Sequence, residues 1–270
     1  MVIISVVRDF QMYDELVRNN PFNKDASLYV IDNRQENKNI STRYNEFLGS
    51  YDYNKPDWFI FCHEDWEVLQ DWSVLDNLDK NCLWGPVGVL PYKKFPFTKN
   101  KQVKNIIVGQ ILESDKQGKL KKITGNILIT KNVSTFDCQC IIVHSSLIKK
   151  YNLRFDENLA FDLYAEDFCA AAMEKHKIPS KIVYLKCQHH SFGNVQDRYW
   201  KQLSYLQEKY KSSERAYCST CSDGQIFGSH DVLYYIKNRL LILLYNSKVT
   251  SSGYRSIKVC KIPVWRKKVK

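Results

Sequence analysis

The strongest constraint on the fold is a set of three apolar runs, at residues 2–7, 27–31 and 58–62. Apolar residues at helical spacing lie between the runs; Pro21 ends the first such stretch, and Ser41 is placed to cap the second. Strands that alternate with helices indicate βαβ units and a mostly parallel sheet. Residues 1–210 are therefore expected to form an α/β domain with helices on both faces of a central sheet.

An acidic residue follows each of the three runs: Asp9, Asp32 and Asp65. The carboxyl ends of parallel strands meet at one edge of a sheet, and ligands bind in the crevice beyond that edge. One acid after a strand is often an ordinary loop residue. Three in succession predict a crevice with acidic side chains.

The middle of the chain has a looser, basic pattern, with candidate hairpin strands at residues 106–112 and 123–129. Glu166 and Asp167 then precede an apolar stretch and are expected in the first turn of a helix, where acids also serve as ordinary first-turn residues. His189 and His190 follow a last short strand; paired histidines offer imidazole ligands, although a single histidine is more often structural.

The positive charge of the chain is concentrated at its end. The formal net charge is +11, and residues 254–270 contain seven Lys or Arg and no acid. A nucleic-acid-binding domain spreads its basic surface through the fold, so no nucleic-acid partner is expected. A basic end with Trp265 beside it is typical of a segment that touches an anionic membrane surface, and a solvated tail is the alternative.

Residues 211–270 are expected to form a separate helical, basic extension. Its apolar stretch at residues 233–245 is too short and too charged to cross a bilayer, so a docking helix is predicted. The nine cysteines show no disulfide framework and the first residues no signal-peptide pattern, which favours a cytoplasmic protein. Cys218 and Cys221 form one CxxC near His230, but no second ligand pair supports a structural zinc.

Three segments, in this order, resemble the family-2-like glycosyltransferases of the GT-A fold, which is Rossmann-like. Residues 58–68, WFIFCHEDWEV, resemble the strand and variant DxD region, closest to bacterial members with F-x-H-x-D. Residues 135–169 resemble the acceptor-side half, ending in the Glu-Asp motif, and His189-His190-Ser191-x-Gly193 resembles the histidine motif. The resemblance covers residues 2–210 and implies inverting sugar transfer from a nucleotide donor.

The resemblance also implies roles for individual residues. Asp65 takes the place of the metal-binding aspartate for Mn²⁺ or Mg²⁺, and His189 or His190 that of a further metal ligand. Asp167 matches the catalytic base, with Glu166 as the alternative. His63 replaces the aspartate that contacts ribose, which removes a negative charge from the metal site. The nucleotide-sugar-binding set is Asp32, Asn33, Asn45, His63, Glu64 and Asp137.

The expected function is thus transfer of a sugar from a nucleotide donor to a hydroxyl of a surface glycan: a polysaccharide, lipooligosaccharide or glycoprotein. The resemblance implies a UDP-sugar as the donor. A lipid-linked acceptor would place the enzyme on the inner face of the membrane. A nucleotidyltransferase would need a glycine-rich loop after the first strand, and residues 7–10, VRDF, contain no glycine. An inactive fold, or a basic module attached to membrane or nucleic acid through residues 254–270, remains the alternative.

Overall fold

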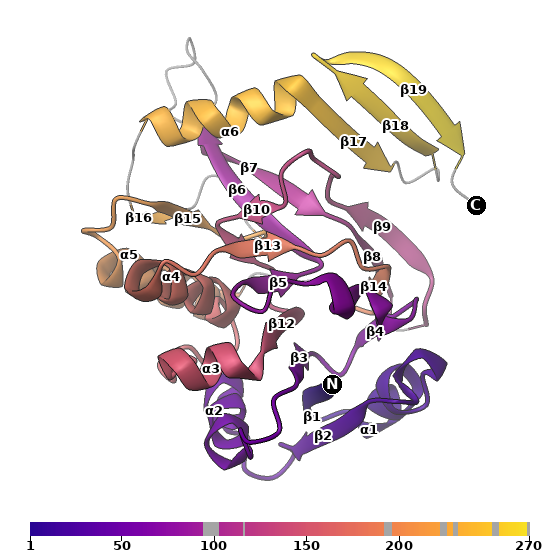
Figure 1. Cartoon of the computed structure of the whole chain (residues 1–270), viewed down its shortest axis with the longest axis vertical. Helices are drawn as coiled ribbons and strands as arrows, with labels where there is room; N and C mark the ends of the chain where they lie inside the picture. Colours follow the sequence, from indigo (N-terminus) through magenta and orange to yellow (C-terminus); the bar gives the residue numbers. More distant parts are fainter. Residues whose placement is uncertain are drawn as a thin grey trace.

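The computed structural model describes residues 1–93, 103–115, 117–191, 196–221, 226–228, 232–249 and 254–268 (Figure 1). At its centre is a seven-stranded sheet. The strands in spatial order are β10 (Asn132–Val133), β13 (Ser180–Ile182), β5 (Leu83–Gly85), β12 (Cys140–His144), β3 (Trp58–Cys62), β1 (Val2–Val7) and β2 (Ser27–Asp32).

The expected single, mostly parallel sheet of the Rossmann-like GT-A type is wrong. In the central sheet β1 is parallel to β2 and β3, and β13 to β5, but β12 runs antiparallel to both of its neighbours, as does β10 to β13. Four smaller sheets accompany it, and their pairings are mostly antiparallel. A parallel pair needs a long crossover connection, and much of the chain after β3 folds back into antiparallel pairs instead.

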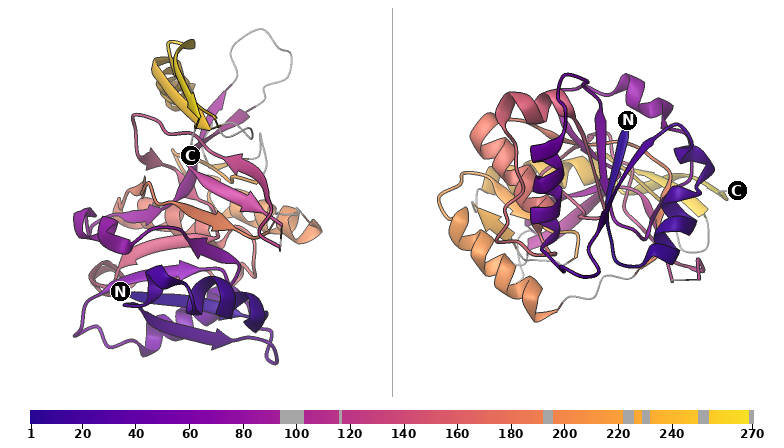
Figure 2. Two further views of the ribbon diagram at one scale, coloured as in Figure 1. Left: turned by 90° about the vertical axis from the view of Figure 1, so that its right-hand side faces the viewer. Right: turned by 90° about the horizontal axis from the view of Figure 1, so that it is seen from below.

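Two core layers cover the central sheet, because successive side chains of a strand point to opposite faces. On β3, Phe59 and Phe61 point into one layer and Ile60 and Cys62 into the other. The first layer contains α2 (Ile40–Ser50), α3 (Ser145–Tyr151) and α4 (Tyr164–His176), and the second contains α1 (Phe10–Tyr13), η1 (Asp14–Arg18) and η3 (Trp72–Asn77). Figure 2 shows α2 and α1 on opposite sides of β1–β3.

Residues 87–124 form two hairpins, β6–β7 and β8–β9, where a parallel fold would have helices. The three-stranded sheet β11-β6-β7 comprises Thr135–Phe136, Val87–Lys93 and Val103–Gly109. The four-stranded sheet β4-β14-β8-β9 comprises Trp66–Val68, Cys187–His189, Ile111–Ser114 and Leu120–Thr124. This second sheet matters for function, because β14 brings a late segment of the chain beside β4.

The helical extension expected at residues 211–270 is helical only in α6, and most of its other described residues form strands. After η2 (Pro21–Asn23) and the elements above, the chain has α5 (Asp197–Lys209), β15 (Ala216–Cys218), β16 (Ile226–Gly228) and α6 (Val232–Leu244). It ends in the antiparallel sheet β17 (Tyr245–Val249), β18 (Tyr254–Val259) and β19 (Ile262–Lys268). Cys260 and Lys261 both have positive φ, as a two-residue hairpin turn requires, so the chain reverses there. Within the described residues, no helix is both long and apolar enough to cross a bilayer.

Candidate metal centre and its cavities

His63, Asp65 and His189 come together where β3 passes into β4. Their ligand atoms, one from each side chain, all lie within 4.8 Å of one another. His63 and Asp65 follow the end of β3, and His189 reaches them because β14 pairs antiparallel with β4 and sets His189 opposite Trp66. The strand-end position of Asp65 and the register of the long-range β4–β14 pairing therefore build the cluster.

The hydrogen bonds of His63 leave one ring nitrogen free. Its Nε2 lies 2.9 Å from the hydroxyl oxygen of Tyr164, and that hydroxyl donates to the carbonyl of Cys138 at 2.5 Å. Since the Tyr164 proton is used there, Nε2 must be the donor to Tyr164, and a neutral His63 has its lone pair on Nδ1. Burial lowers the pKa of His63, which favours the neutral ring. Nδ1 lies 3.9 Å from Asp65 Oδ1, on the side of the cluster.

Asp65 and His189 each direct a buried polar atom, Oδ1 and Nε2, toward the centre of the cluster. Asp65 Oδ1 and His189 Nε2 are 3.2 Å apart, but neither has a partner with hydrogen-bond geometry among the described residues. Burial raises the pKa of Asp65, but the interactions with His189 outweigh burial and bring it to about 2. The carboxylate is therefore ionised. Orphaned buried polar atoms are costly, and a cation bound between them removes that cost.

The structure distinguishes the two adjacent histidines. The ring of His190 points away from the cluster and pairs with Glu67, with Nε2 2.8 Å from Oε2. His190 contributes its backbone N–H instead, which donates to the carbonyl of Asp65 at 2.8 Å. His189 is thus the ligand candidate, and His190 fixes the backbone of Asp65.

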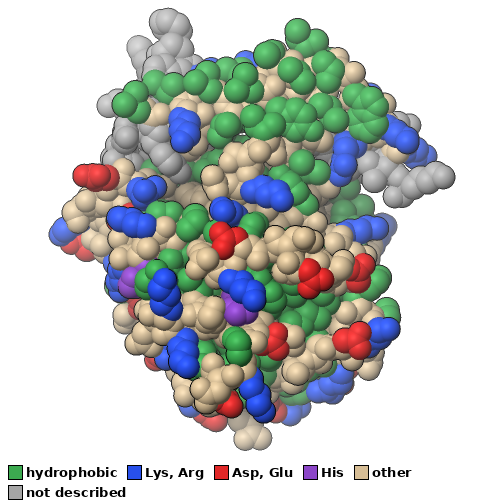
Figure 3. Space-filling model, viewed as in Figure 1, with side chains coloured by type: hydrophobic (Ala, Val, Ile, Leu, Met, Phe, Trp, Pro, Cys, Tyr) green, Lys and Arg blue, Asp and Glu red, His purple; other side chains and the backbone are tan. Residues whose placement is uncertain are grey.

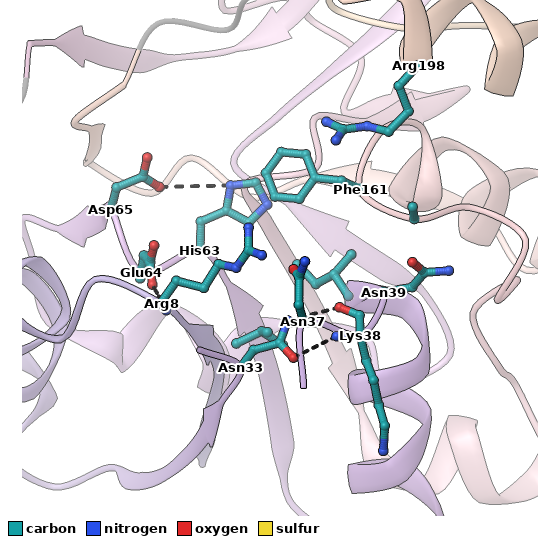
Figure 4. A pocket seen from close by; sticks show the side chains of 13 residues that line it. Arg8, Asn33, Asn37, Lys38, Asn39, His63, Glu64, Asp65, Phe161 and Arg198 are labelled. Carbon is teal, nitrogen blue, oxygen red and sulfur yellow. Dashed lines mark hydrogen bonds and ion pairs between the residues drawn. The ribbon is translucent and has the colours of Figure 1, made fainter. Parts of the chain in front are cut away.

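Two cavities meet at this cluster, and His63, Asp65, Phe161 and Arg198 line both. The first cavity has a volume of about 310 Å³ and the second about 420 Å³, within the range of small-molecule sites. The first is bounded by the end of β1 and the segment before α2 (Figure 4). The second is bounded by β8, β9, α5 and the segment after β15.

The first cavity combines two guanidinium groups with an exposed aromatic ring. Arg8 follows β1, and Arg198 lies in the first turn of α5 (Figure 4). Phe161 stacks on His63, with ring centroids 5.6 Å apart and an interplanar angle of 24°. The Arg198 guanidinium lies 5.2 Å from the centroid of the Phe161 ring and donates to Asp162 at 2.6 Å. Two arginines beside a cation site suit a ligand with phosphate groups.

The second cavity is lined by three carboxylates in addition to Asp65. Glu113 pairs with Lys122 at 3.4 Å and accepts from Thr124. Asp162 is held by Arg198. Among the described residues, the hydrogen-bond donors to Asp137 are neutral: it accepts from the side-chain amide of Gln139 at 3.0 Å and from the hydroxyl of Thr220. Asp137 is therefore the carboxylate of this cavity that no described cation neutralises.

Glu166 and Asp167 lie in the first turn of α4 as the sequence predicted, but neither lines the two cavities. Asp167 is buried and accepts from Lys209 Nζ and from the Tyr210 hydroxyl, both at 2.7 Å. Glu166 is also buried, and its Oε2 has no described hydrogen-bond partner. Burial, followed by the charge of Asp137, raises the pKa of Glu166 to about 8, so it is protonated at neutral pH.

Of the six predicted nucleotide-binding residues, three line the first cavity, Asp137 lines the second, and two lie outside both. His63, Glu64 and Asn33 line the first cavity, and Glu64 accepts from the backbone N–H groups of Arg8 and Asp9 at 2.5 and 3.0 Å. Burial raises the pKa of Glu64. Asn33 is buried and accepts from the backbone of Lys38, so it shapes the loop before α2.

Asp32 and Asn45 lie outside both cavities. Asp32 is exposed and forms an ion pair with Arg34, 2.6 Å from Oδ2 to the nearest guanidinium nitrogen. Asn45 bridges α2 to the segment before α4, donating to the carbonyl of Phe155 and accepting from its N–H, both at 2.9 Å. A scaffolding role accounts for Asn45 fully.

Sequence reasoning missed Arg8, Phe161 and Arg198. Arg8 carried a signal, because it directly follows the first strand. Phe161 and Arg198 carried none, since their segments resemble ordinary loop and helix. In the predicted CxxC, Cys218 is buried and Cys221 exposed, and both are free thiols. The nearby His230 and the Gly193 of the histidine motif lie outside the described residues.

Comparisons with known proteins add little to this geometry. No protein-family model and no curated protein matches the chain. One similar solved structure is "Crystal Structure of A197 from STIV", with 12% identity and a TM-score of 0.35 over 85% of this chain and 94% of that one. At that TM-score the likeness supports no conclusion about fold or function.

Proposed function

We propose that this protein is a metal-assisted, inverting glycosyltransferase that uses a nucleotide-diphosphate sugar, with UDP as the nucleotide. The observation that carries the proposal is the position of the His63–Asp65–His189 cluster at the junction of two cavities. One cavity offers two arginines for a diphosphate, and the other offers an unneutralised carboxylate for an acceptor hydroxyl. The sequence resemblance to family-2-like glycosyltransferases supports the same reaction.

Asp65, His189 and His63 are the residues that would hold the cation. Two imidazoles and one carboxylate suit Mn²⁺ better than Mg²⁺, which prefers an all-oxygen shell. When bound, a divalent cation neutralises charge that develops on a departing diphosphate. The orphaned Asp65 Oδ1 and His189 Nε2 fit such an ion.

The chain's own residues would divide the remaining work between the two cavities. Arg8 and Arg198 bind the diphosphate, and the Phe161 ring provides an apolar platform for the sugar or base. In the second cavity the acceptor oxygen attacks the anomeric carbon of the sugar. The bond from that carbon to the phosphate oxygen breaks, and its electron pair leaves with the nucleoside diphosphate. The acceptor proton passes to a carboxylate. Because the oxygen attacks on the face opposite the departing diphosphate, this single displacement inverts the anomeric centre.

We assign that carboxylate to Asp137 rather than to the expected Asp167. A base must reach the proton it accepts, and Asp137 lines the second cavity whereas Asp167 pairs with Lys209 and Tyr210. Glu166 is protonated at neutral pH and is a poor base there. Its neutral state avoids placing a second negative charge close to Asp137.

The first experiment is a thermal-shift titration with UDP, GDP, CDP and dTDP, each with Mn²⁺, with Mg²⁺ and with EDTA. We expect stabilisation by UDP that requires the metal and is greater with Mn²⁺. Asp65→Asn should abolish the metal dependence. Glu67→Gln is the matched control, because Glu67 is two residues away on β4 but pairs with His190. No response to any nucleotide would instead favour an inactive fold or a binding module.

A second experiment tests the base. Donor hydrolysis and sugar transfer are compared for Asp137→Asn, Asp167→Asn and the parent chain, with nucleotide affinity measured in parallel. We expect Asp137→Asn to bind donor normally and to lose about 10²-fold or more in turnover. A larger loss in Asp167→Asn, at unchanged stability, would return the base to Asp167.

The proposed acceptor is a hydroxyl of a surface glycan or of its lipid-linked precursor, assembled at the cytoplasmic side of the membrane. Nine free cysteines support a reducing compartment, and nucleotide sugars are the donors expected there.

A further inference from the structure

The outer face of α6 is apolar, the reverse of an ordinary surface helix. Leu233, Leu240 and Leu244 have exposed fractions of 74%, 51% and 53%. With the exposed Lys237 they follow one another at intervals of four, three and four residues, which places them in a single stripe along the helix. Ordinarily such a stripe faces the core.

The opposite side of α6 is already fixed to the protein. Asn238 is buried and donates to the carbonyl of Pro91 on β6 at 2.8 Å. Leu241 and Ile242 pack against the first core layer, the one that contains α2, α3 and α4. The helix is therefore seated through its other face, and the leucine stripe points outward as a consequence of that packing.

The β18–β19 hairpin continues the apolar surface. Val259, Ile262, Val264 and Trp265 have exposed fractions between 40% and 64%. Basic residues are interleaved with them, including the exposed Lys258, Lys261 and Arg266. Figure 3 shows hydrophobic side chains gathered along α6 and across the β17–β19 region of this face, with Lys and Arg beside them. We call the exposed residues of α6 and of the β18–β19 hairpin the docking face.

The charge of this part of the chain has one sign. Residues 232–270 contain ten Lys or Arg and no Asp or Glu. That concentration accounts for most of the net charge of +11. An apolar stripe flanked by cations without acids matches an anionic lipid surface, where leucine and tryptophan side chains enter the headgroup boundary and cations contact lipid phosphates.

We propose that the docking face binds the surface of a bilayer containing anionic lipids, with α6 and the β18–β19 hairpin lying in the interface. The inference is independent of the glycosyltransferase proposal. A second copy of the chain is disfavoured, because a symmetric interface would bring two basic faces together. Nucleic acid would engage the cations but offers no apolar surface to match the exposed leucine stripe.

The test uses the full chain and sedimentation with vesicles of phosphatidylcholine alone or mixed with phosphatidylglycerol. We expect binding to the mixed vesicles only, and weaker binding at high salt. The triple variant Leu233→Ser, Leu240→Ser, Leu244→Ser should bind the mixed vesicles at least about tenfold more weakly than the parent does. The matched control is Phe22→Ser with Leu120→Ser, which removes two exposed apolar side chains elsewhere and should bind as the parent does.

A second measurement does not depend on how the triple variant folds. Brominated lipid quenches tryptophan fluorescence at short range, and the quenching lost in Trp265→Phe is the contribution of Trp265. We expect that contribution to be large with mixed vesicles and absent with phosphatidylcholine. Equal binding to both vesicle types, unchanged binding of the triple variant, or no quenching of Trp265 would each overturn the proposal. So would self-association of the parent chain that the same triple variant abolishes, or salt-sensitive binding to duplex DNA in place of vesicles.

Discussion

The hydroxyl of Tyr164 lies 2.9 Å from His63 Nε2 and thereby fixes which nitrogen of that ring can face a cation. Tyr164 is the first residue of α4, so the start of one helix orients a side chain at the end of β3. Groups that orient metal-binding histidines in this way contribute strongly to metal affinity. Metal binding at the cluster can therefore be tested by changing Tyr164, without removing any of the three candidate ligands.

Tyr164→Phe is therefore expected to raise the dissociation constant for Mn²⁺ about tenfold or more, because the His63 ring loses its orienting partner. Calorimetric titration of Mn²⁺ measures the change. Tyr13→Phe is the control: its buried hydroxyl has no described hydrogen-bond partner, so its loss should leave the affinity unchanged. Equal affinity in the two variants would show that Tyr164 does not orient a metal ligand.

The sequence predicted Asp65 as a candidate metal ligand but did not choose between His189 and His190. An acid at the end of an apolar run is visible from local pattern alone. Adjacent residues of an extended segment point to opposite faces, so at most one of the two histidines was expected to face Asp65. The choice depends on the register of β14 against β4, which sets His189 opposite Trp66, and no local pattern encodes that register.

The same limit explains the errors in the fold. A single strand was expected at residues 106–112, but Gly109, with φ of +92°, ends β7 and a new strand, β8, begins at Ile111. The two halves join different sheets. Strand content was visible in the sequence, whereas direction and partner were set by long-range pairing. Likewise, the first turn of α4 was located correctly, but the burial of Asp167 depends on Lys209 and Tyr210 at the end of α5.

Glu166 should make the stability of the protein depend on pH. Its pKa is raised from 4.5 to about 8, first by burial and then by the charge of Asp137. Between these values the folded state holds a proton that the unfolded state has lost, so the free energy of unfolding falls as pH rises. The stabilisation from the bound proton is complete below about pH 4.5 and is lost as the pH rises through about 8. Between these two pH values the free energy of unfolding falls by an amount on the order of 5 kcal/mol.

Glu166→Gln, which resembles the protonated side chain, is expected to remove most of this dependence. Chemical denaturation of both proteins across this pH range measures it, and Glu208→Gln, on the exposed side of α5, serves as the control. Parallel pH profiles for the parent and Glu166→Gln would mean that Glu166 is ionised in the folded protein at neutral pH.

Lys209 should contribute much more to stability than its neighbour Lys211. Lys209 pairs with the buried Asp167 at 2.7 Å, and Lys209→Met leaves that carboxylate without its cation, at a cost of about 3 kcal/mol. Lys211 pairs with Glu208, and both side chains are largely exposed, so Lys211→Met should change little. Denaturant titration compares the two variants. Similar small losses would show that Asp167 does not need its cation, and would reopen a catalytic role for Asp167.

Phe161 is expected to act on ligand affinity and not on stability. Phe161 is 46% exposed, and its ring stacks on His63 and lies beneath the Arg198 guanidinium. A ring held open to a cavity in this way contributes by stacking on a ligand, an effect of about 1–3 kcal/mol for a nucleobase. Phe161→Ala should therefore raise the dissociation constant of UDP in the presence of Mn²⁺ about tenfold, with an unchanged melting temperature. Phe22→Ala removes a ring of similar exposure from η2 and should change neither quantity. If Phe161→Ala lowered the melting temperature and left UDP affinity intact, the ring would be a packing element of the His63 side chain, and the first cavity would have to bind its ligand through Arg8 and Arg198 alone.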